Sequence, residues 1–265
     1  MKILGVDTSS DICSVCLLED NITLKELNLN NGRTHSENLV PLLKELMDSC
    51  NVTFKDIELI AVNKGPGSFT GIRIGISTIK AIAEVHNIKV VGVTSLKSLC
   101  FNELHLNKDK IKETPITENA YSSLPENKPC NPTYRDFPCI ISLIDARNNQ
   151  VYCGVFNSNS NSENEDIYLA DNINIVLENI KRYIDQNTVF IGNGSVLHKS
   201  LIQENFNFPL KFSNINEQSS VSTALAGLEI YKTGNLDTAD TILPFYLRKS
   251  QAERMKEINN NGNNK

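Results

Sequence analysis

The stretch "IAVNKGPGSFTGIRIG", residues 60–75, places a short apolar run, a glycine turn and a second apolar pattern in direct succession. A continuous apolar run of this length predicts a buried strand. Gly65 and Gly67 form the turn, and the isoleucines that follow at helical spacing predict a long helix from Ser68 to His86. A strand, a tight turn and a helix in this order are typical of an α/β fold.

Two interpretations of this turn differ in their chemistry. Its backbone amides could bind an anion at the start of the helix, as phosphate loops do. Alternatively, the glycines only shape the turn, Ser68 or Thr70 caps the helix, and Gly71 and Gly75 allow close packing against a neighbour. We favour the second interpretation, because the stretch lacks the lysine and hydroxyl residue that end a Walker loop.

The order of elements recurs in the second half of the chain. "CIISLIDARNNQVYCGVFN", from residue 139, reads as a strand that ends in an aspartate, then a turn and a second strand. "TVFIGNGSVLHKSLI", from residue 188, again joins a strand to a glycine turn and a helix. Asp145 thus corresponds to Asp7, and the turn at Gly192 corresponds to the turn at Gly65. The repeat predicts a duplicated α/β lobe.

The polar segments divide the chain. Residues 105–138 are rich in Lys, Glu, Asn and Pro and have a poor apolar pattern, which indicates an exposed insertion or linker. The asparagine-rich end is typical of a flexible tail. We therefore expect an N-terminal lobe over residues 1–104, the insertion over 105–138, a C-terminal lobe over 139–250 and a tail over 251–265.

Two helices offer apolar faces. In "THSENLVPLLKELMDSC", Thr34 and Glu37 have the spacing of a capping box, but Pro41 favours a helix that begins late. The helix from Ser68 has two apolar stripes, although covering a sheet needs only one. Its second stripe consists of Ile74, Ala81, Ile82 and Val85 and is a candidate partner surface. The leucine ridge and the first stripe, which we assign to a partner interface, are Leu39, Leu42, Leu43, Leu46, Ile72, Ile76, Ile79 and Ala83.

The composition excludes several classes of protein. A net charge of −5 argues against a chain that grips nucleic acid alone over a broad basic face. No apolar run approaches the roughly 20 residues of a membrane helix, and the start of the chain has no signal-peptide core. We therefore expect a cytoplasmic protein. The seven cysteines are scattered, which favours reduced thiols, and Cys13 and Cys16 would point to opposite faces of a strand.

The candidates for chemistry are few. Asp7 ends a predicted strand at the edge where α/β folds bind ligands, so it could hold a metal-water shell beside a phosphate; it could equally cap its own turn, and both interpretations remain open. The four histidines are dispersed and no serine has the GxSxG elbow, so we expect no resident metal and no catalytic residue. The candidate nucleotide-binding residues are Asp7, Thr8, Ser9, Gly65, Gly67 and Ser68.

Several blocks together resemble the TsaB family, also called YeaZ, over residues 1 to about 250. They are "ILGVDTSSDICSVCL", "THSENLVPLLKELM", "IAVNKGPGSFTGIRIGISTIKAIA", "VVGVTSLKSL", "LIDARNNQVYCGVF" and "PFYLRKS". The resemblance implies the actin-like ATPase (ribonuclease H-like) fold with two related lobes of mixed sheet and helices. Residues 105–138 look longer than is usual for the family, and nothing is carried over to them.

The resemblance also implies a function and partners. Members of the family form a heterodimer with their paralogue TsaD and work with the ATPase TsaE. TsaD transfers threonylcarbamoyl from its adenylate to N6 of the adenosine beside the anticodon in tRNAs that read codons starting with A. Helices that match residues 37–50 and 68–86 form a helical bundle with the partner. We therefore expect a non-catalytic scaffold subunit that reaches tRNA through the complex, and a homodimer is plausible when it is alone.

The resemblance argues against other activities. TsaD has two metal-binding histidines four residues apart, whereas Ser95 and Leu99 stand roughly at those positions here. We therefore expect no cofactor of the chain's own, although ATP or ADP could lie at a shared site. The alternative function is an ATPase or phosphotransferase of the actin-like superfamily that uses Asp7 and the Gly65–Gly67 turn, with residues 145–149 and 192–195 as the only candidate partner loops.

Overall fold

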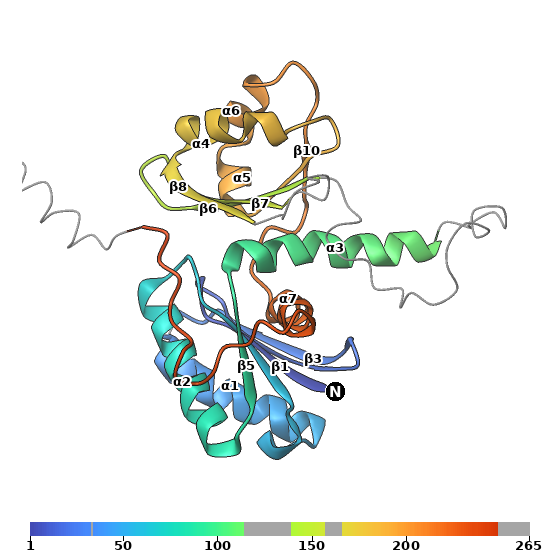
Figure 1. Ribbon diagram of the computed structural model, residues 1–265, viewed down its shortest axis with the longest axis vertical. Helices are drawn as coiled ribbons and strands as arrows, with labels where there is room; N and C mark the ends of the chain where they lie inside the picture. Colours follow the sequence, from blue (N-terminus) through green and yellow to red (C-terminus); the bar gives the residue numbers. More distant parts are fainter. Residues whose placement is uncertain (33, 114–138, 157–165, 249–265) are drawn as a thin grey trace, which may run out of the picture.

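The computed structural model describes residues 1–32, 34–113, 139–156 and 166–248, which form two lobes (Figure 1). The N-terminal lobe has a five-stranded sheet with two long helices on one face. Its strands are β1 (Lys2–Asp7), β2 (Cys13–Glu19), β3 (Ile22–Leu29), β4 (Leu59–Asn63) and β5 (Lys89–Val93). Its helices are α1 (His35–Cys50), the short 3-10 helix η1 (Phe54–Asp56) and α2 (Phe69–His86).

The C-terminal lobe contains a second five-stranded sheet with shorter helices. Its strands are β6 (Ile140–Asp145), β7 (Gln150–Phe156), β8 (Ile167–Asn172), β9 (Val189–Ile191) and β10 (Lys211–Phe212). Its helices are α4 (Ile173–Ile180), η4 (Lys181–Tyr183), α5 (Asn193–Leu197) and α6 (Lys199–Glu204). The expected insertion beyond residue 113, the polar hairpin tip and the tail lie outside the described residues.

The two sheets share one topology. The N-terminal strands follow the order β3-β2-β1-β4-β5, and the C-terminal strands follow the matching order β8-β7-β6-β9-β10. In each sheet an antiparallel meander of three strands is extended by parallel strands beside its first strand. Gly65 and Gly192, at the corresponding turns, both have a φ of 100°. The predicted duplication and the actin-like ATPase fold are therefore confirmed.

The last helix of each half packs on the sheet of the other half. Helix α3 (Ser95–Glu113) follows β5 but contacts β6, β7 and β9, whereas α7 (Ser220–Lys232) contacts β1, β2, β4 and β5. Figure 1 shows α3 between the sheets and α7 against the N-terminal sheet. The two lobes therefore do not correspond to the expected ranges 1–104 and 139–250. Residues 105–113 continue α3, and a helix from the second half completes the first lobe.

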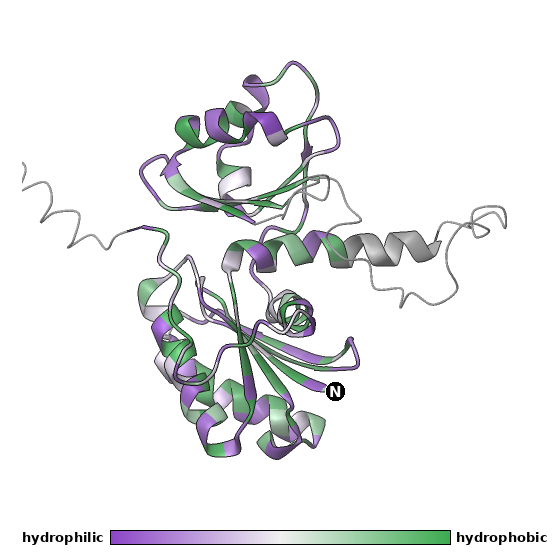
Figure 2. Ribbon diagram, in the orientation of Figure 1, coloured by the Kyte–Doolittle hydropathy of each residue, from purple (hydrophilic) through white to green (hydrophobic). Residues whose placement is uncertain are grey.

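One apolar core spans both halves of the chain. It contains Ile3 and Val93 of the first sheet, Ile140 and Phe156 of the second, and Val221 of α7. A second core lies under α1 and α2, and a third fills the C-terminal lobe under α4 and α6. Figure 2 shows that hydrophobic residues predominate in the strands of both sheets. The lobes are therefore joined by buried apolar surface, not only by the chain.

Helix α1 begins earlier than Pro41 predicted. The Thr34 side chain and the Glu37 side chain form the expected capping box, and the helix runs from His35 through Pro41 to Cys50. Proline leaves the carbonyl oxygen four residues before it without an intrahelical donor. Both Glu37 and Pro41 are exposed, so water can reach that oxygen. The expectation of a late start was therefore wrong.

The chain after α7 forms a strap, residues 234–248, along the N-terminal lobe. Asp237 makes an isolated antiparallel bridge with Val90 of β5, and Ile242 is fully buried in the core beneath α2. The Phe245 amide donates to the Lys64 carbonyl at 2.7 Å. The strap then reaches the C-terminal lobe, where the Arg248 guanidinium donates to the Ala146 carbonyl at 3.5 Å.

Candidate functional site

Asp7 lies at the carboxyl end of β1, where its carboxylate is fully buried. One oxygen accepts hydrogen bonds from the Ser9 amide (2.8 Å) and the Ser9 hydroxyl (2.7 Å). The other oxygen accepts from the Asn63 amide group (2.5 Å) and the Thr223 hydroxyl (3.3 Å). Burial raises the pKa of Asp7, although these donors favour the charged form. Both oxygens are thus occupied by the chain itself.

Gly67, just before α2, and Gly71 and Gly75 within it allow the β1–β2 loop to pack directly on the helix. A Cβ at Gly67, Gly71 or Gly75 would lie within 3.0 Å of an atom of Ser9 or Thr8. The Ser68 amide donates to the Ser9 carbonyl at 2.8 Å, and the Thr8 hydroxyl donates to the Gly71 carbonyl at 2.8 Å. The protein's own loop therefore occupies space that an anion would need at this turn.

Ser68 caps α2, because its hydroxyl accepts from the Gly71 amide at 3.2 Å. The packing interpretation of the turn is confirmed at three positions: the Ser68 cap and the close contacts at Gly71 and Gly75. Gly65 shapes the turn with its positive φ and donates its amide to the Asn63 side chain at 2.9 Å. The stretch is thus a packing element that joins β4 to α2.

A cleft of about 650 Å³ lies between the lobes beside this turn. Of the candidate nucleotide-binding residues, Ser9, Gly67 and Ser68 line it, whereas the other three do not. Asp7 and Thr8 are fully buried, and Gly65 is buried too. The charged residues that line the cleft are Asp11, Asp145, Arg147, Glu217 and Arg248, so three carboxylates face two guanidinium groups. This balance does not favour a polyphosphate.

Asp7 and Asp145, which end corresponding strands of the two lobes, have different surroundings. Asp145 is half-buried and lines the cleft, whereas Asp7 is fully buried. The Asp145 carboxylate accepts from the Arg147 amide at 2.9 Å and shapes the β6–β7 turn. Arg147 and the two asparagines after it all have positive φ values of 54–63°. This turn thus exposes one carboxylate and one guanidinium to the cleft, without the glycine-rich backbone that surrounds phosphates in many enzymes.

Ser95 and Leu99, the positions where the resemblance would place metal ligands, carry no metal-binding group. The Ser95 hydroxyl donates to the Asn63 side chain at 2.7 Å, and Leu99 is buried in the central core. Among the residues that the structure describes, no three His, Cys, Asp or Glu side chains gather as metal ligands would. Cys13 and Cys16 lie in the cores on opposite faces of the sheet, as predicted. Burial raises the pKa of Cys13 to about 11, so its thiol stays protonated.

The residues that we assigned to the partner interface are buried inside the chain. All eight, from Leu39 of α1 to Ala83 of α2, belong to the core under the N-terminal sheet and are at most 6% exposed. Their assignment to a surface was wrong, because these stripes are the ones that cover the sheet. Periodicity identifies the stripes of a helix but not which of them a sheet covers.

The second stripe of α2 lies at the surface. Val85 is 77% exposed and Ala81 is exposed, whereas Ile74 and Ile82 are half-buried and pack against the core. Val40 of α1, which the sequence did not single out, is 58% exposed. Helices α1 and α2 contact each other, so these residues belong to one helical layer.

A second cavity brings together residues that the sequence had not connected. It has a volume of about 420 Å³ and lies where β5, β8 and the strap meet. Lys64 and Asp237 both line it, although they are far apart in the chain. No spacing pattern relates these residues, so only the fold reveals the cavity.

In the described ranges of the chain, no helix is long and apolar enough to cross a membrane.

The chain resembles known proteins, some of them along nearly its whole length. The tRNA threonylcarbamoyladenosine biosynthesis protein TsaB of Bacillus subtilis is 26% identical and covers 96% of both chains. The TsaB of Escherichia coli is 32% identical over 37% of this chain and 42% of that protein. The structure of YeaZ from Pseudomonas aeruginosa has the same fold, with a TM-score of 0.67 at 20% identity, and covers 93% of this chain and 99% of that one.

A family model named for a threonylcarbamoyltransferase matches a part of the first half of the chain. The family model "TsaD: tRNA N6-adenosine threonylcarbamoyltransferase" matches residues 29–123. The transferase of that name from Bacillus thuringiensis strain Al Hakam is 32% identical over 34% of this chain and 31% of its own length. The likeness along 96% of the chain, the duplicated fold and the packed glycine turn agree: the chain resembles the TsaB (YeaZ) proteins over nearly its whole length.

Proposed function

We propose that this chain is a non-catalytic scaffold subunit for the synthesis of threonylcarbamoyladenosine in tRNA. In this proposal it works in the cytoplasm, forms a heterodimer with TsaD, cooperates with TsaE and meets tRNA only within the complex. Its relatives along the full length carry the name of this biosynthesis. The observation that carries the proposal is the exposed second stripe of α2, with Val85 and Ala81 at the surface.

The outer face of α2 suits a helical partner. Ser77, Ala81 and Val85 follow one another at four-residue intervals, so they form one row along the exposed side of the helix. None of these side chains is charged, and the small ones let another helix approach closely. An apolar row on a stable helix favours association, because contact with a partner removes it from water. We infer that TsaD packs on this row and on the neighbouring surface of α1 around Val40.

The nucleotide-using alternative has less support. Asp7 is sealed by hydrogen bonds, and the loop before α2 is filled by the carbonyl of Ser9. The lining of the cleft also carries more carboxylates than guanidinium groups. In the proposal the chain therefore has no cofactor of its own, and any ATP or ADP lies at a site shared with TsaD.

Co-purification with TsaD from the same cell tests the proposal. Val85→Asp and Ala81→Asp place a charge on the outer row of α2 without disturbing the core, and each should abolish the complex. The matched control is Val196→Asp on α5 of the other lobe, where Val196 is 56% exposed. It should leave the complex intact. Ile76 and Leu43 are unsuitable probes, because both are buried and a charge there would unfold the protein.

Two results would overturn the proposal. The first is threonylcarbamoyladenosine made by the purified chain alone, with tRNA and the adenylate supplied. The second is a complex with TsaD that survives both α2 variants. Light scattering on the isolated chain shows whether the same row makes a homodimer. If it does, Val85→Asp should convert that dimer to a monomer.

A further inference from the structure

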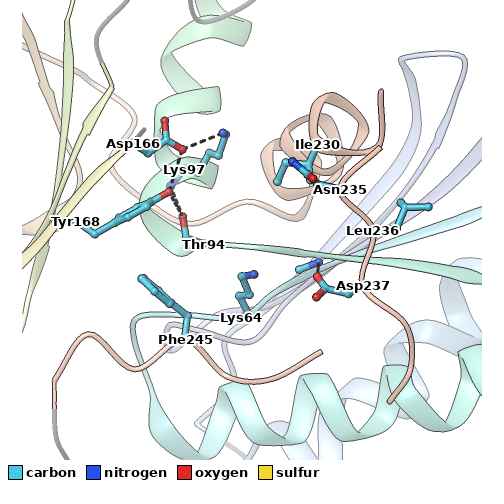
Figure 3. Close-up of a pocket in the computed structure, with 11 residues that line it drawn as sticks. Lys64, Thr94, Lys97, Asp166, Tyr168, Ile230, Asn235, Leu236, Asp237 and Phe245 are labelled. Carbon is cyan, nitrogen blue, oxygen red and sulfur yellow. Dashed lines mark hydrogen bonds and ion pairs between the residues drawn. The ribbon is translucent and has the colours of Figure 1, made fainter. Parts of the chain in front are cut away.

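The cavity beside β5 is lined by several separate parts of the chain. The N-terminal lobe contributes Lys64, Gly92 and Thr94, and the start of α3 contributes Lys97. Figure 3 shows Lys64, Thr94 and Lys97 around a shared space with Asp166 and Tyr168 of the C-terminal lobe and Phe245 of the strap. Its volume of about 420 Å³ is in the range of small-molecule sites.

On one side of the cavity, the charged side chains are paired with each other. The Lys97 ammonium forms an ion pair with the Asp166 carboxylate at 3.0 Å, and both side chains are largely buried. The same carboxylate oxygen accepts from the Tyr168 hydroxyl at 3.2 Å, and Tyr168 is joined to the Thr94 hydroxyl at 3.2 Å. These groups position the wall and need no further partner.

The other side has two charges that are not paired with each other. In the described part of the chain, neither Lys64 nor Asp237 forms an ion pair. One Asp237 oxygen accepts from the Gly92 amide at 2.9 Å. A Cβ on Gly92 would lie 2.7 Å from Lys64 Cδ and 3.0 Å from this Asp237 oxygen, so both side chains flank the bare glycine. An ammonium and a carboxylate thus line one small space.

We propose that this cavity binds a small α-amino acid as its zwitterion. The ligand's carboxylate contacts the Lys64 ammonium, and its ammonium group contacts the free side of the Asp237 carboxylate. Its side chain lies against Phe245, which is next to Lys64 in Figure 3, and Ile230 and Leu236 line the far side of the cavity. Charge-assisted hydrogen bonds of this kind are shorter and stronger than neutral ones.

The charge balance selects a zwitterion over simpler ions. The lining contains two lysines and two aspartates, so its formal charge is zero. A phosphate or other anion would gain Lys64 but face the uncompensated Asp237, and a simple cation would meet the reverse arrangement. A ligand that carries both charges satisfies both groups. Lys64 precedes the α2 turn, whereas Asp237 belongs to the strap, so a ligand bound to both side chains would link these two segments. The Phe245 amide, which donates to the Lys64 carbonyl, already joins the same segments.

Nuclear magnetic resonance on the isotope-labelled full chain tests the inference. The common L-amino acids are titrated singly, and the Gly92 amide signal reports occupancy because this amide is bonded to Asp237. At least one amino acid should shift that signal saturably. Lys64→Met and Asp237→Asn should each weaken binding by about tenfold or more, as expected for the loss of a charged hydrogen bond. Lys44→Met and Asp48→Asn, at exposed positions of α1, are the matched controls and should leave the affinity unchanged.

Analogues of the tightest ligand separate the alternatives. Its decarboxylated amine and its deaminated acid should each bind at least about tenfold more weakly than the amino acid. Equal binding of the acid, or of inorganic phosphate, would show a simple anion site and overturn the inference. A Gly92 signal that no amino acid shifts would also overturn it. The test needs no partner protein, so its failure is independent of the proposed complex with TsaD.

Discussion

Single glycines determine how closely α2 approaches the β1–β2 loop. Gly71 has no room for a side chain, since a Cβ would lie within 3.0 Å of the Thr8 carbonyl oxygen, which is rigid backbone. We expect Gly71→Ala to lower the free energy of unfolding by about 1–3 kcal/mol, even though alanine favours helices. Urea denaturation followed by circular dichroism measures this change.

The neighbouring residue supplies the control for that measurement. Thr70 is exposed in the same turn of α2, so Thr70→Ala should change the free energy of unfolding by no more than about 0.5 kcal/mol. If Gly71→Ala were as harmless as Thr70→Ala, the close packing of the loop on α2 would not contribute to stability.

Asp7 should give the protein a distinctive dependence on pH. Burial raises its pKa above the ordinary value of 3.8, so the folded state holds this proton more tightly than the unfolded state does. The free energy of unfolding contributed by Asp7 therefore falls as the pH rises from 3.8 through the raised pKa. Asp7→Asn removes this dependence.

Urea denaturation of the wild type and Asp7→Asn across that interval measures the effect. The stability advantage of the wild type should shrink as the pH rises, because only the wild type must bury a charge. The variant should also be less stable by about 1–3 kcal/mol at low pH, since its amide donor would face the donor of Asn63. Parallel pH profiles of the two proteins would contradict the raised pKa.

Local chemistry was predictable from sequence at some residues and not at others. The Ser68 cap and the packing role of Gly71 and Gly75 follow from residue type and position, which act within a few residues. The surface assignment of Ile76 failed, because the face that a helix turns to a sheet depends on distant strands. The role of Asp7, as a ligand-binding group or as a cap of its own turn, could not be decided from sequence for the same reason. One of its hydrogen-bond partners, Thr223, lies on the distant helix α7.

At the scale of elements, the strap has one deeply buried side chain besides its hydrogen bonds to the N-terminal lobe. Ile242 is fully buried in the core beneath α2, whereas its neighbour Leu243 is 66% exposed. Truncation of Ile242 to alanine should lower the free energy of unfolding by roughly 2–5 kcal/mol, because it removes buried methyl groups and leaves a cavity.

Leu243→Ala is the natural comparison, since it removes an apolar side chain from the next residue at the surface. It should cost no more than about 0.5 kcal/mol. Thermal and urea denaturation of both variants give these values. Equal costs would mean that the strap is not packed into the core of the N-terminal lobe.

The strands and the two helices of the N-terminal lobe were predicted because their apolar periods are strong. Helix α7 was not, because its sequence "SVSTALAGLEIYK" buries polar residues as well as apolar ones. Ser222 bonds to Asn102, and Thr223 bonds to Ser98 and Asp7. These partners become visible only when the lobes are assembled. The strap could not be predicted from sequence either, because residues 234–248 show no hydrophobic periodicity of a helix or strand.

For the whole molecule, the exchange of α3 and α7 predicts a single unfolding transition. Neither lobe retains its complete core without a helix from the other half, and the central core contains residues of both sheets. Differential scanning calorimetry should therefore give one peak, with a calorimetric enthalpy close to the van't Hoff enthalpy.

Variants in separate cores provide the check. Leu46→Ala lies in the N-terminal core and Ile180→Ala in the C-terminal core, and both side chains are fully buried. Each should lower the midpoint of the whole transition. A peak that splits in either variant would show that the lobes unfold independently.

The duplication was predictable because each half repeats its own local order of strands, turns and helices. The exchange of the last helices was not, since a helix packs equally well on either of two similar sheets and the choice lies in the connection between lobes. The placement of Lys64 and Asp237 in the lining of one cavity is likewise a property of the assembled chain.

The exchanged helix also sets the order of events during synthesis. The face of the first sheet that α7 covers must wait for residues 220–232 to leave the ribosome, although its own strands end at Val93. Most of the nascent chain is therefore made while that apolar face is open to chaperones and proteases. A messenger truncated before α7 would yield a product with neither lobe complete, and the cell would clear it instead of accumulating a folded half.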